Sequence, residues 1–240
     1  MQLHGTIPPH LGNLSFLVSL DISNNKFHGN LPEELAHLPR LKLIDVTSNN
    51  LTGVVPTSLS LLPNLQYMYL SINQFSGEIP YSLSNLTKLE VLKIKGSPRE
   101  LDIPPSIFNI TIMRVISLSN NNLTGELPTT ICDHLPNLEG LRLSENILGG
   151  IIPPNLEKCK NLKVLSLSIN EFTGTIPRNL GNITNITELY LVLQHLEGEI
   201  PVELGNLKKL QILSLSGCKL TGSIPTSIFN MSALQIVGLY

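Results

Sequence analysis

The sequence contains no tryptophan, and aromatic residues make up only 5% of its 240 residues. Charged residues are also scarce at 14%, and the formal net charge of -2 excludes the strongly basic surface on which nucleic-acid binding depends. No apolar run approaches the roughly 20 residues that cross a bilayer. The first residues lack the basic start and apolar core of a secretory signal. We therefore expect any signal peptide or membrane anchor to lie outside these residues.

Motifs that carry enzyme chemistry are missing as well. There is neither a G-x-x-x-x-G-K-[ST] phosphate loop nor a G-x-G-x-x-G dinucleotide turn. The histidines show no ligand spacing, and Cys132 with His134 has no second pair to complete a tetrahedral metal site. Serines such as Ser166 and Ser168 recur with the repeat described next, which marks them as outward strand positions and not activated nucleophiles. We predict no catalytic residue, no metal site and no cofactor.

One pattern, L-x-x-L-x-L-x-x-N-x-L-x-G-x-I-P, runs along the whole chain. Its first apolar position recurs every 24 residues, apart from one interval of 25 between Met113 and Leu138. The positions that carry it are Leu17, Leu41, Leu65, Leu89, Met113, Leu138, Leu162, Ile186, Leu210 and Leu234. A period of this length indicates stacked structural repeats. We predict one array over residues 1–240, of about ten repeats, with partial repeats at both ends and no terminal caps.

Each position of the pattern has a physical role. Leu165 and Leu167 have the period of two that sends alternate side chains of a strand to one face, so both point inward. Asn170 offers amide donors and an acceptor to backbone groups where the chain leaves the strand, and its repetition predicts an asparagine ladder. Gly174 permits a tight turn, and Pro177 ends the pairing. One repeat cannot bury its own leucines, so stability must come from stacking.

The phrase "IPxxLGNLxxLxxLxLSxNxLxG" resembles the plant-type leucine-rich repeat of receptor-like kinase and receptor-like protein ectodomains. Residues 127–146 and 155–168 are similar to the receptor-kinase group that senses bacterial elicitors. The resemblance implies an α/β leucine-rich repeat solenoid, a curved right-handed superhelix with short parallel strands on the concave face and 3-10 or short helical returns on the convex face. It also implies a secreted, N-glycosylated ectodomain on the outer side of the plasma membrane, followed by one transmembrane helix and a serine/threonine kinase.

Asn-x-Ser/Thr sequons agree with secretion. They occur at Asn13, Asn50, Asn85, Asn109, Asn122, Asn182, Asn185 and Asn230. Five of them share one repeat phase on the expected convex side, where a glycan would leave the concave sheet open. Because this motif is also part of the repeat consensus, duplication alone explains its recurrence equally simply. The family context favours glycosylation at some of these sites.

The three cysteines leave an odd thiol. Cys132 and Cys159 fall one repeat apart on the return segments, and two interpretations stay open for them. They form a disulfide if their Cα atoms lie about 4.4–6.8 Å apart; alternatively, Cys159 fills an inward leucine position as a small hydrophobe. Cys218 occupies the ladder position held elsewhere by asparagine, which predicts a buried structural thiol.

Binding in such an array is expected at the variable outward positions of the strands. In the N-terminal repeats these are Asp21 and Asp45, and Glu188 occupies one later in the chain. The predicted ligand-binding residues are Tyr67, Tyr69, Lys93, Lys95, Arg114, Arg142 and Tyr190. The first five fall on three adjacent strands and combine aromatic area with a basic cluster, which suits a peptide or an acidic group. Lys93-Ile94-Lys95 resembles the Arg-x-Arg pair by which some receptors of this family hold a peptide carboxylate, but lysine lacks the bidentate fork.

Two repeats depart from the ladder. After Ile94 the pattern becomes "GSPRELD", with Ser97, Arg99 and Leu101 where Asn, Leu and Gly are expected. Gln194 replaces asparagine in a second repeat, which predicts a second interruption. Loops that break a regular scaffold often carry function, whereas drift in a single repeat is an equally simple explanation.

Three functional classes compete. The leading hypothesis is the ligand-sensing ectodomain of a receptor kinase that binds a peptide or microbial protein and then a co-receptor kinase, with no nucleic-acid partner. A second is an inhibitor of the polygalacturonase-inhibitor type, or a receptor-like protein, neither of which has a kinase. Such inhibitors are closed by caps at about this repeat number, and we expect the flanking sequence to separate the two classes. An enzyme is disfavoured because no acid, base or metal groups converge.

Overall fold

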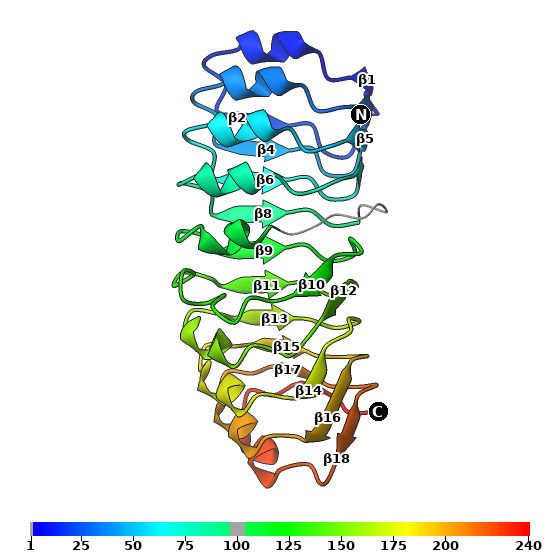
Figure 1. Cartoon of the computed structure of the whole chain (residues 1–240), viewed down its shortest axis with the longest axis vertical. Coiled ribbons are helices and arrows are strands. Elements are labelled where there is room, and N and C mark those ends of the chain that lie inside the picture. Colours follow the sequence, from blue (N-terminus) through cyan, green and yellow to red (C-terminus); the bar gives the residue numbers. More distant parts are fainter. Residues whose placement is uncertain (1, 97–103) are drawn as a thin grey trace. The chain divides into compact units, whose positions relative to one another are not determined.

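The computed structural model describes residues 2–96 and 104–240, and its contacts divide the chain into two compact units, Met1–Leu123 and Thr124–Tyr240. Each unit is a stack of coils with short parallel strands on one side and single turns of 3-10 helix on the other (Figure 1). Ser97, Arg99 and Leu101, the predicted break after Ile94, lie outside the described residues. The alternation of strand and helical return that the repeat predicts is confirmed in both units.

The first unit has a main sheet of five parallel strands. These are β2 (Ser19–Asp21), β4 (Leu43–Asp45), β6 (Tyr67–Tyr69), β8 (Val91–Lys93) and β9 (Val115–Ser117), which pair in that order. A second parallel sheet holds β1 (His4–Thr6), β3 (Lys26–Gly29), β5 (Asn50–Gly53) and β7 (Gln74–Phe75). The returns are η1 (Pro9–Asn13), η2 (Glu33–His37), η3 (Thr57–Leu61), η4 (Tyr81–Asn85) and η5 (Pro105–Asn109).

The second unit repeats this plan. Its main sheet pairs β11 (Gly140–Arg142), β13 (Val164–Ser166), β15 (Glu188–Tyr190), β17 (Ile212–Ser214) and β19 (Ile236–Gly238) in parallel. Beside it lie the pair β10 (Thr124–Glu126) and β12 (Ile147–Gly149) and the sheet β14 (Thr173–Thr175), β16 (His195–Glu199) and β18 (Lys219–Thr221). The returns are η6 (Pro154–Lys158), η7 (Arg178–Asn182), η8 (Val202–Asn206) and η9 (Thr226–Asn230). No helix in the described ranges is long and apolar enough to cross a membrane.

The core lies between the strands and the returns of each unit. Leu165 and Leu167 are fully buried, as the period of two predicts. A proline precedes each 3-10 turn, and its fixed φ sets the direction in which the chain enters the turn. The third residue of the turn, such as Leu180, is buried in the core. Because every coil contributes the same inward set, the apolar layer is continuous through a unit and each coil depends on its neighbours.

The asparagine ladder is present where each chain leaves its strand. Asn170 is 5% exposed; its Nδ2 donates to Leu143 O at 3.0 Å and Leu167 O at 2.8 Å, and its Oδ1 accepts from Leu148 N–H at 3.0 Å. The interruption predicted at Gln194 is wrong. Its longer side chain donates to Leu167 O and accepts from Phe172 N–H, so the amide still reaches the two groups of the preceding coil that a ladder asparagine bonds.

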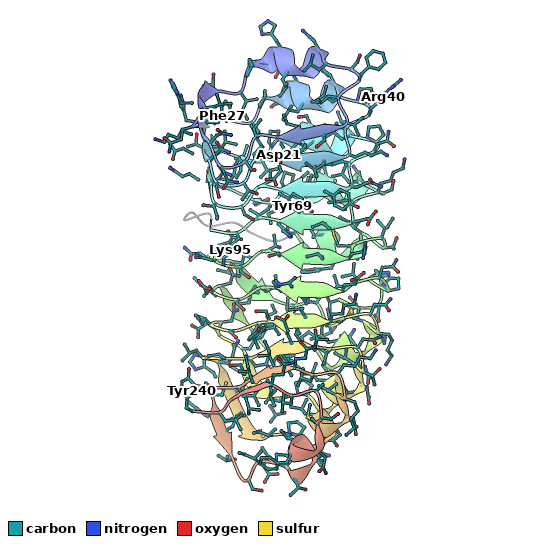
Figure 2. The ribbon with its side chains drawn as sticks, turned by 180° about the vertical axis from the view of Figure 1, so that it is seen from behind. Asp21, Phe27, Arg40, Tyr69, Lys95 and Tyr240 are labelled. Atoms are coloured by element: carbon teal, nitrogen blue, oxygen red, sulfur yellow. A yellow bond between two sulfur atoms is a disulfide. The ribbon has the colours of Figure 1, made fainter. Side chains whose placement is uncertain are left out.

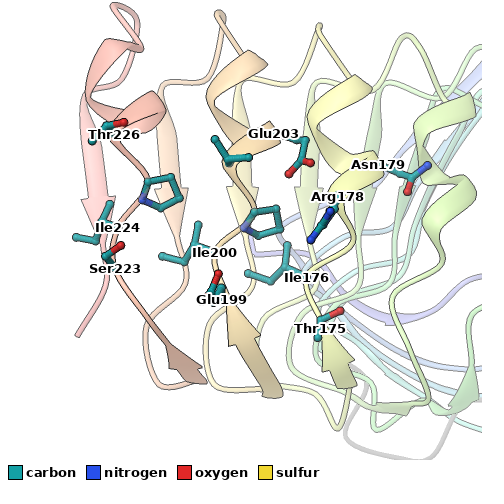
Figure 3. A pocket seen from close by; sticks show the side chains of 13 residues that line it. Thr175, Ile176, Arg178, Asn179, Glu199, Ile200, Glu203, Ser223, Ile224 and Thr226 are labelled. Atoms are coloured by element: carbon teal, nitrogen blue, oxygen red, sulfur yellow. The ribbon is translucent and has the colours of Figure 1, made fainter.

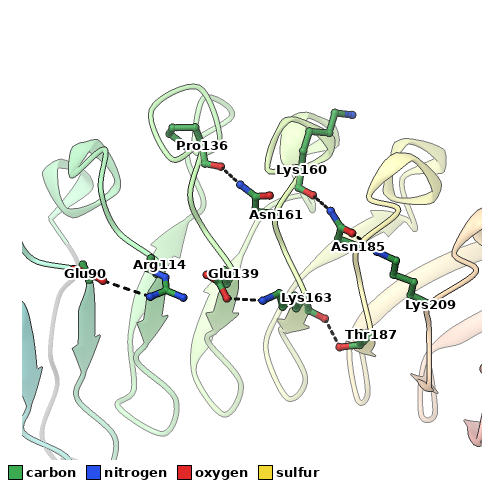
Figure 4. Close-up of polar contacts among 10 residues, drawn as sticks. All are labelled: Glu90, Arg114, Pro136, Glu139, Lys160, Asn161, Lys163, Asn185, Thr187 and Lys209. Carbon is green, nitrogen blue, oxygen red and sulfur yellow. Dashed lines mark hydrogen bonds and ion pairs between the residues drawn. The ribbon is translucent and has the colours of Figure 1, made fainter.

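A second row of polar contacts joins the coils at the edge before the main strands (Figure 4). Asn161 Nδ2 donates to Pro136 O and Asn185 Nδ2 to Lys160 O, both at 2.9 Å. Lys209 Nζ donates to Asn185 Oδ1 at 2.7 Å, so both ends of that amide are engaged. Like the ladder amides, these asparagines follow the repeat, because each donates to a carbonyl of the preceding coil, 25 residues earlier.

Candidate functional site

Three-residue strands place the candidate binding residues on the open face of the main sheet. In β6 the central Met68 is fully buried, so Tyr67 and Tyr69 on either side of it point outward. The equal repeat length then sets the register, and Tyr69 pairs directly with Lys93 of β8. The structure therefore brings together the tyrosines and the first lysine of the predicted cluster. Figure 2 shows Tyr69 and Lys95 on this part of the first unit.

The aromatic and basic side chains contact one another. The rings of Tyr67 and Tyr69 are stacked with centroids 6.5 Å apart, and Lys93 Nζ lies 5.0 Å from the centroid of the Tyr69 ring. This cation–π contact orients the ammonium over the ring and leaves it exposed. Burial, followed by the neighbouring Tyr67 and Asp45, raises the pKa of the Tyr69 phenol, so it stays a neutral hydrogen-bond donor at physiological pH. Lys95 is exposed two residues further along the chain.

Charge is ordered along this row of the sheet. Asp21 pairs with Asp45, Asp45 with Tyr69, and Tyr69 with Lys93, so the row passes from two carboxylates through an aromatic ring to an ammonium group. The backbone N–H and side chain of Ser23 lower the pKa of Asp21, which keeps that end negative. The N–H of Thr47 donates to Asp45 Oδ1 at 2.9 Å and holds the second carboxylate in place. The sequence pattern identified both acids as outward residues but did not group them with the Tyr and Lys residues.

The other predicted binding residues lie apart from this row. Arg114 stands beside Glu90, whose Oε2 lies 3.5 Å from its Nη1 (Figure 4). It precedes β9 and lies one position before the strand position that Tyr67 occupies in β6. In the second unit, Ser166 separates Arg142 from Tyr190 in the register of β11, β13 and β15. The Tyr190 hydroxyl donates to Glu188 Oε2 at 3.1 Å, and burial followed by that carboxylate raises its pKa.

A hollow on the return side of the second unit was not foreseen from the sequence (Figure 3). Its volume is about 840 Å³, and successive Ile-Pro steps such as Ile200-Pro201 form much of its lining. Arg178 and Glu203 also face it, and the buried Glu203 Oε2 has no hydrogen-bond partner in the described part of the chain. The lining residues come from three successive coils and are far apart in the sequence. In the sequence, the hollow was therefore indicated only by the repetition of the Ile-Pro step.

The predicted modification sites fall into distinct settings. Five sequons, at Asn13, Asn85, Asn109, Asn182 and Asn230, occupy the last residue of a 3-10 turn and are exposed. Asn50 and Asn122 are exposed where the chain leaves the ladder. Asn182 Nδ2 donates to Glu157 Oε2 at 2.6 Å, and Asn185 differs because both ends of its amide are held in the edge row described above. Glycosylation at any of these positions stays a prediction.

Both interpretations of the cysteine pair find a counterpart in the structure. Cys132 and Cys159 are joined, with Cα atoms 5.2 Å apart, and Cys159 is also fully buried at an inward position. Cys218 is only half-buried; its Sγ donates to Leu191 O at 3.0 Å in place of the ladder amide, and burial raises the pKa of this thiol. Within residues 2–96 and 104–240 no three His, Cys, Asp or Glu side chains gather as a metal site.

Comparisons with known proteins agree with this architecture. Profiles of the leucine-rich repeat family match residues 39–98 and, as single repeats, 16–38, 113–134, 137–159, 161–183 and 209–231. The plant peptide hormone receptor RGFR1, solved in complex with RGF2, is 34% identical with a TM-score of 0.91 over 97% of this chain and 37% of its own. A TDR receptor is 31% identical with a TM-score of 0.96 over 100% and 41%. A plant ice-binding protein is 29% identical with a TM-score of 0.81 over 99% and 78%.

No curated protein matches the chain at a significant level. The chain spans only about two fifths of the length of the two receptors. The ice-binding protein shows that this scaffold hosts unrelated functions, so the fold alone does not assign a ligand.

Proposed function

Because the chain belongs to the leucine-rich repeat family, we propose that it is the ligand-recognition part of a receptor-kinase ectodomain and that it binds a peptide on the main sheet of its first unit. Its structure is similar to the ligand-binding ectodomains of plant peptide hormone receptors. The observation that supports the proposal most strongly is the row of Asp21, Asp45, Tyr69 and Lys93 on one open face.

The row suits an extended peptide that crosses the strands. Neighbouring strands lie about 4.8 Å apart, so the three steps from Asp21 to Lys93 cover about 14 Å, the length of about four extended residues. A peptide ammonium or basic side chain would face the carboxylates, and an apolar or proline residue would lie on the tyrosine rings. Its carboxylate would reach Lys93 and Lys95, as a point-charge contact instead of a bidentate one.

The wider proposal follows the family resemblance. The ectodomain faces the outside of the plasma membrane, carries N-glycans on the returns, and passes its signal to a co-receptor kinase and to its own kinase. The ligand is a peptide or microbial protein, and the signal serves defence or development. The resemblance of the segment around Cys132 supports the narrower proposal of an elicitor-sensing group.

Affinity selection from synthetic peptides of about twelve residues with free carboxyl termini tests the binding row, since that length covers the row and its flanks. Calorimetry on the selected peptides should show at least a roughly tenfold loss of affinity, about 1.4 kcal/mol, for Lys93→Glu with Lys95→Glu. Amidation of the peptide carboxylate should weaken binding to the unaltered chain much more than to this variant.

The matched control is Lys26→Glu with Lys88→Glu, which changes the net charge equally at positions outside the row. It should leave affinity within about twofold, because exposed charges beyond a Debye length are screened. Unchanged affinity in the Lys93 and Lys95 variant, or an equal loss in the control, would remove these lysines from the site.

A further inference from the structure

The residue before each ladder amide has a left-handed backbone in both units. In the second unit, Glu145, Ile169 and Leu193 have φ of 61°, 57° and 53°. The N–H of each donates to a carbonyl of the next coil, namely Ser168 O, Val192 O and Ser216 O, at 2.7 to 2.8 Å. The conformation is therefore imposed by the coil-to-coil hydrogen bonds, whichever side chain occupies the position.

Two of these residues are a poor local choice. The left-handed region favours glycine and asparagine, and it is a genuine outlier for a β-branched residue such as isoleucine. Asn24 and Asn120 in the first unit and Gly217 in the second follow the favourable rule at equivalent positions. Ile169 and Leu193 do not, and they are also 45% and 55% exposed. Neither the backbone nor burial accounts for large aliphatic side chains on two neighbouring coils.

The same two side chains line a hollow of about 580 Å³ beside the ladder, which we call the apolar ledge. Leu193 lies over Gly217, where an added Cβ would come within 2.5 Å of Leu193 Cδ2, so the absence of a side chain there makes room for it. Half-buried Cys218 also lines the hollow. The ledge is thus a formed apolar surface, with a thiol at one side.

Charge at the ledge is uneven. Exposed Glu145 precedes Ile169 by one coil, and exposed Glu171 lies in the same hollow, with its Oε2 2.6 Å from His195 Nε2. Lys219 stands at the far side, next to Cys218. The turn-end sequons of this unit, Asn182 and Asn230, lie on the returns and not on the ledge.

We propose that the apolar ledge docks a protein segment that inserts an aliphatic side chain between Ile169 and Leu193 and places a lysine or arginine against Glu145 and Glu171. Because Glu145 and Glu171 make the Ile169 end of the ledge acidic, the partner segment should carry a basic residue beside its aliphatic one. This site is independent of the peptide row in the first unit, because no residue is shared.

The variant Ile169→Asn with Leu193→Asn tests the proposal without threatening the fold, since asparagine already occupies this backbone at Asn24 and Asn120. Its Tm should equal or exceed that of the unaltered chain. Affinity selection from the peptide library should return members with an aliphatic residue beside a basic one. Their affinity should fall at least about tenfold in the variant, because the apolar surface is lost.

Two further measurements locate the binding. A saturating concentration of a selected peptide should slow alkylation of Cys218 by N-ethylmaleimide several-fold, because the thiol lines the hollow. Glu145→Lys should weaken peptides that carry the basic residue and leave those that lack it unchanged. The control Ile72→Asn makes the same change at the same backbone position in the first unit, and it should leave affinity unaltered.

The proposal is overturned if no selected peptide distinguishes the double asparagine variant from the unaltered chain, or if those that do leave Cys218 alkylation unchanged. Lys93→Glu with Lys95→Glu should not affect these peptides. The proposal for the ledge and the proposal for the peptide row can therefore be refuted independently.

Discussion

Replacing Asn170 with alanine should destabilise the second unit strongly. The amide is almost fully buried and bonds the carbonyls of Leu143 and Leu167 and the N–H of Leu148. Alanine leaves the Leu148 N–H without this partner in a space that excludes water, while Leu143 O and Leu167 O each lose one of two donors and keep Asn146 Nδ2 and Gln194 Nε2. At about 1–3 kcal/mol for the unsatisfied N–H and about 0.5–1.5 kcal/mol for each of the two lost hydrogen bonds to the carbonyls, we expect a loss of about 3–5 kcal/mol. A domain of this size loses about 2–4 °C of Tm per kcal/mol, so Tm should fall by about 10 °C.

Asn25→Ala is the matched control because Asn25 makes the same kinds of bond, to Ile22 O, Ser23 O and Leu3 N–H, in a more exposed coil. Water replaces the lost amide there, and the expected cost is about 1 kcal/mol. Urea unfolding followed by circular dichroism measures both variants, and hydrogen exchange at the Leu148 amide reports the local opening. Equal losses of stability in the two variants, or a cost below about 1 kcal/mol for Asn170→Ala, would show that burial of the ladder amide does not stabilise this unit.

Three other predictions concern single groups. Reducing the disulfide on the returns, which closes a loop across a sequence separation of 27, should lower unfolding stability by about 3–4 kcal/mol, and an unchanged urea midpoint under reducing conditions would contradict this. In a secretory host, glycopeptide mass spectrometry should find Asn182 occupied and Asn185 empty, because the Asn185 amide is held at both ends whereas the exposed Asn182 amide only donates to Glu157 Oε2; occupancy of Asn185 would mean that the glycan is attached before the edge row forms. Asp45→Asn should lower the pKa of Tyr69 towards the value of free tyrosine, because the Asp45 charge contributes to its elevation; an unchanged ultraviolet titration would show that burial and Tyr67 suffice.

The scaffold was predictable because its determinants repeat. Leu165, Leu167 and Asn170 each recur in most coils, so a local pattern specifies a structure held together by neighbours. The pairing of Tyr69 with Lys93 followed from equal repeat length. The pattern failed at Gln194, where side-chain length compensated for a change that looked like a break.

Other features depend on contacts that form only in the folded chain. Spacing in sequence could not decide between the two interpretations of Cys132 and Cys159, because bonding depends on a Cα separation that return geometry sets. The sequence alone did not show that Ser166 of β13 lies between Arg142 and Tyr190, two of the predicted binding residues. The left-handed backbone at Ile169 was hidden because that conformation is usually signalled by glycine or asparagine.

The in-register pairing of β11, β13 and β15 has a consequence for how such surfaces change. Val164 pairs with Gly140 on one side and Glu188 on the other, and all three occupy the same position along their strands. Excising residues 162–185 would remove one complete coil and set Gly140 directly against Glu188, with every ladder contact re-formed by an equivalent neighbour. Arg142 would then stand beside Tyr190. The loss or duplication of whole coils can therefore create a new recognition surface without changing the sequence of the coils that remain.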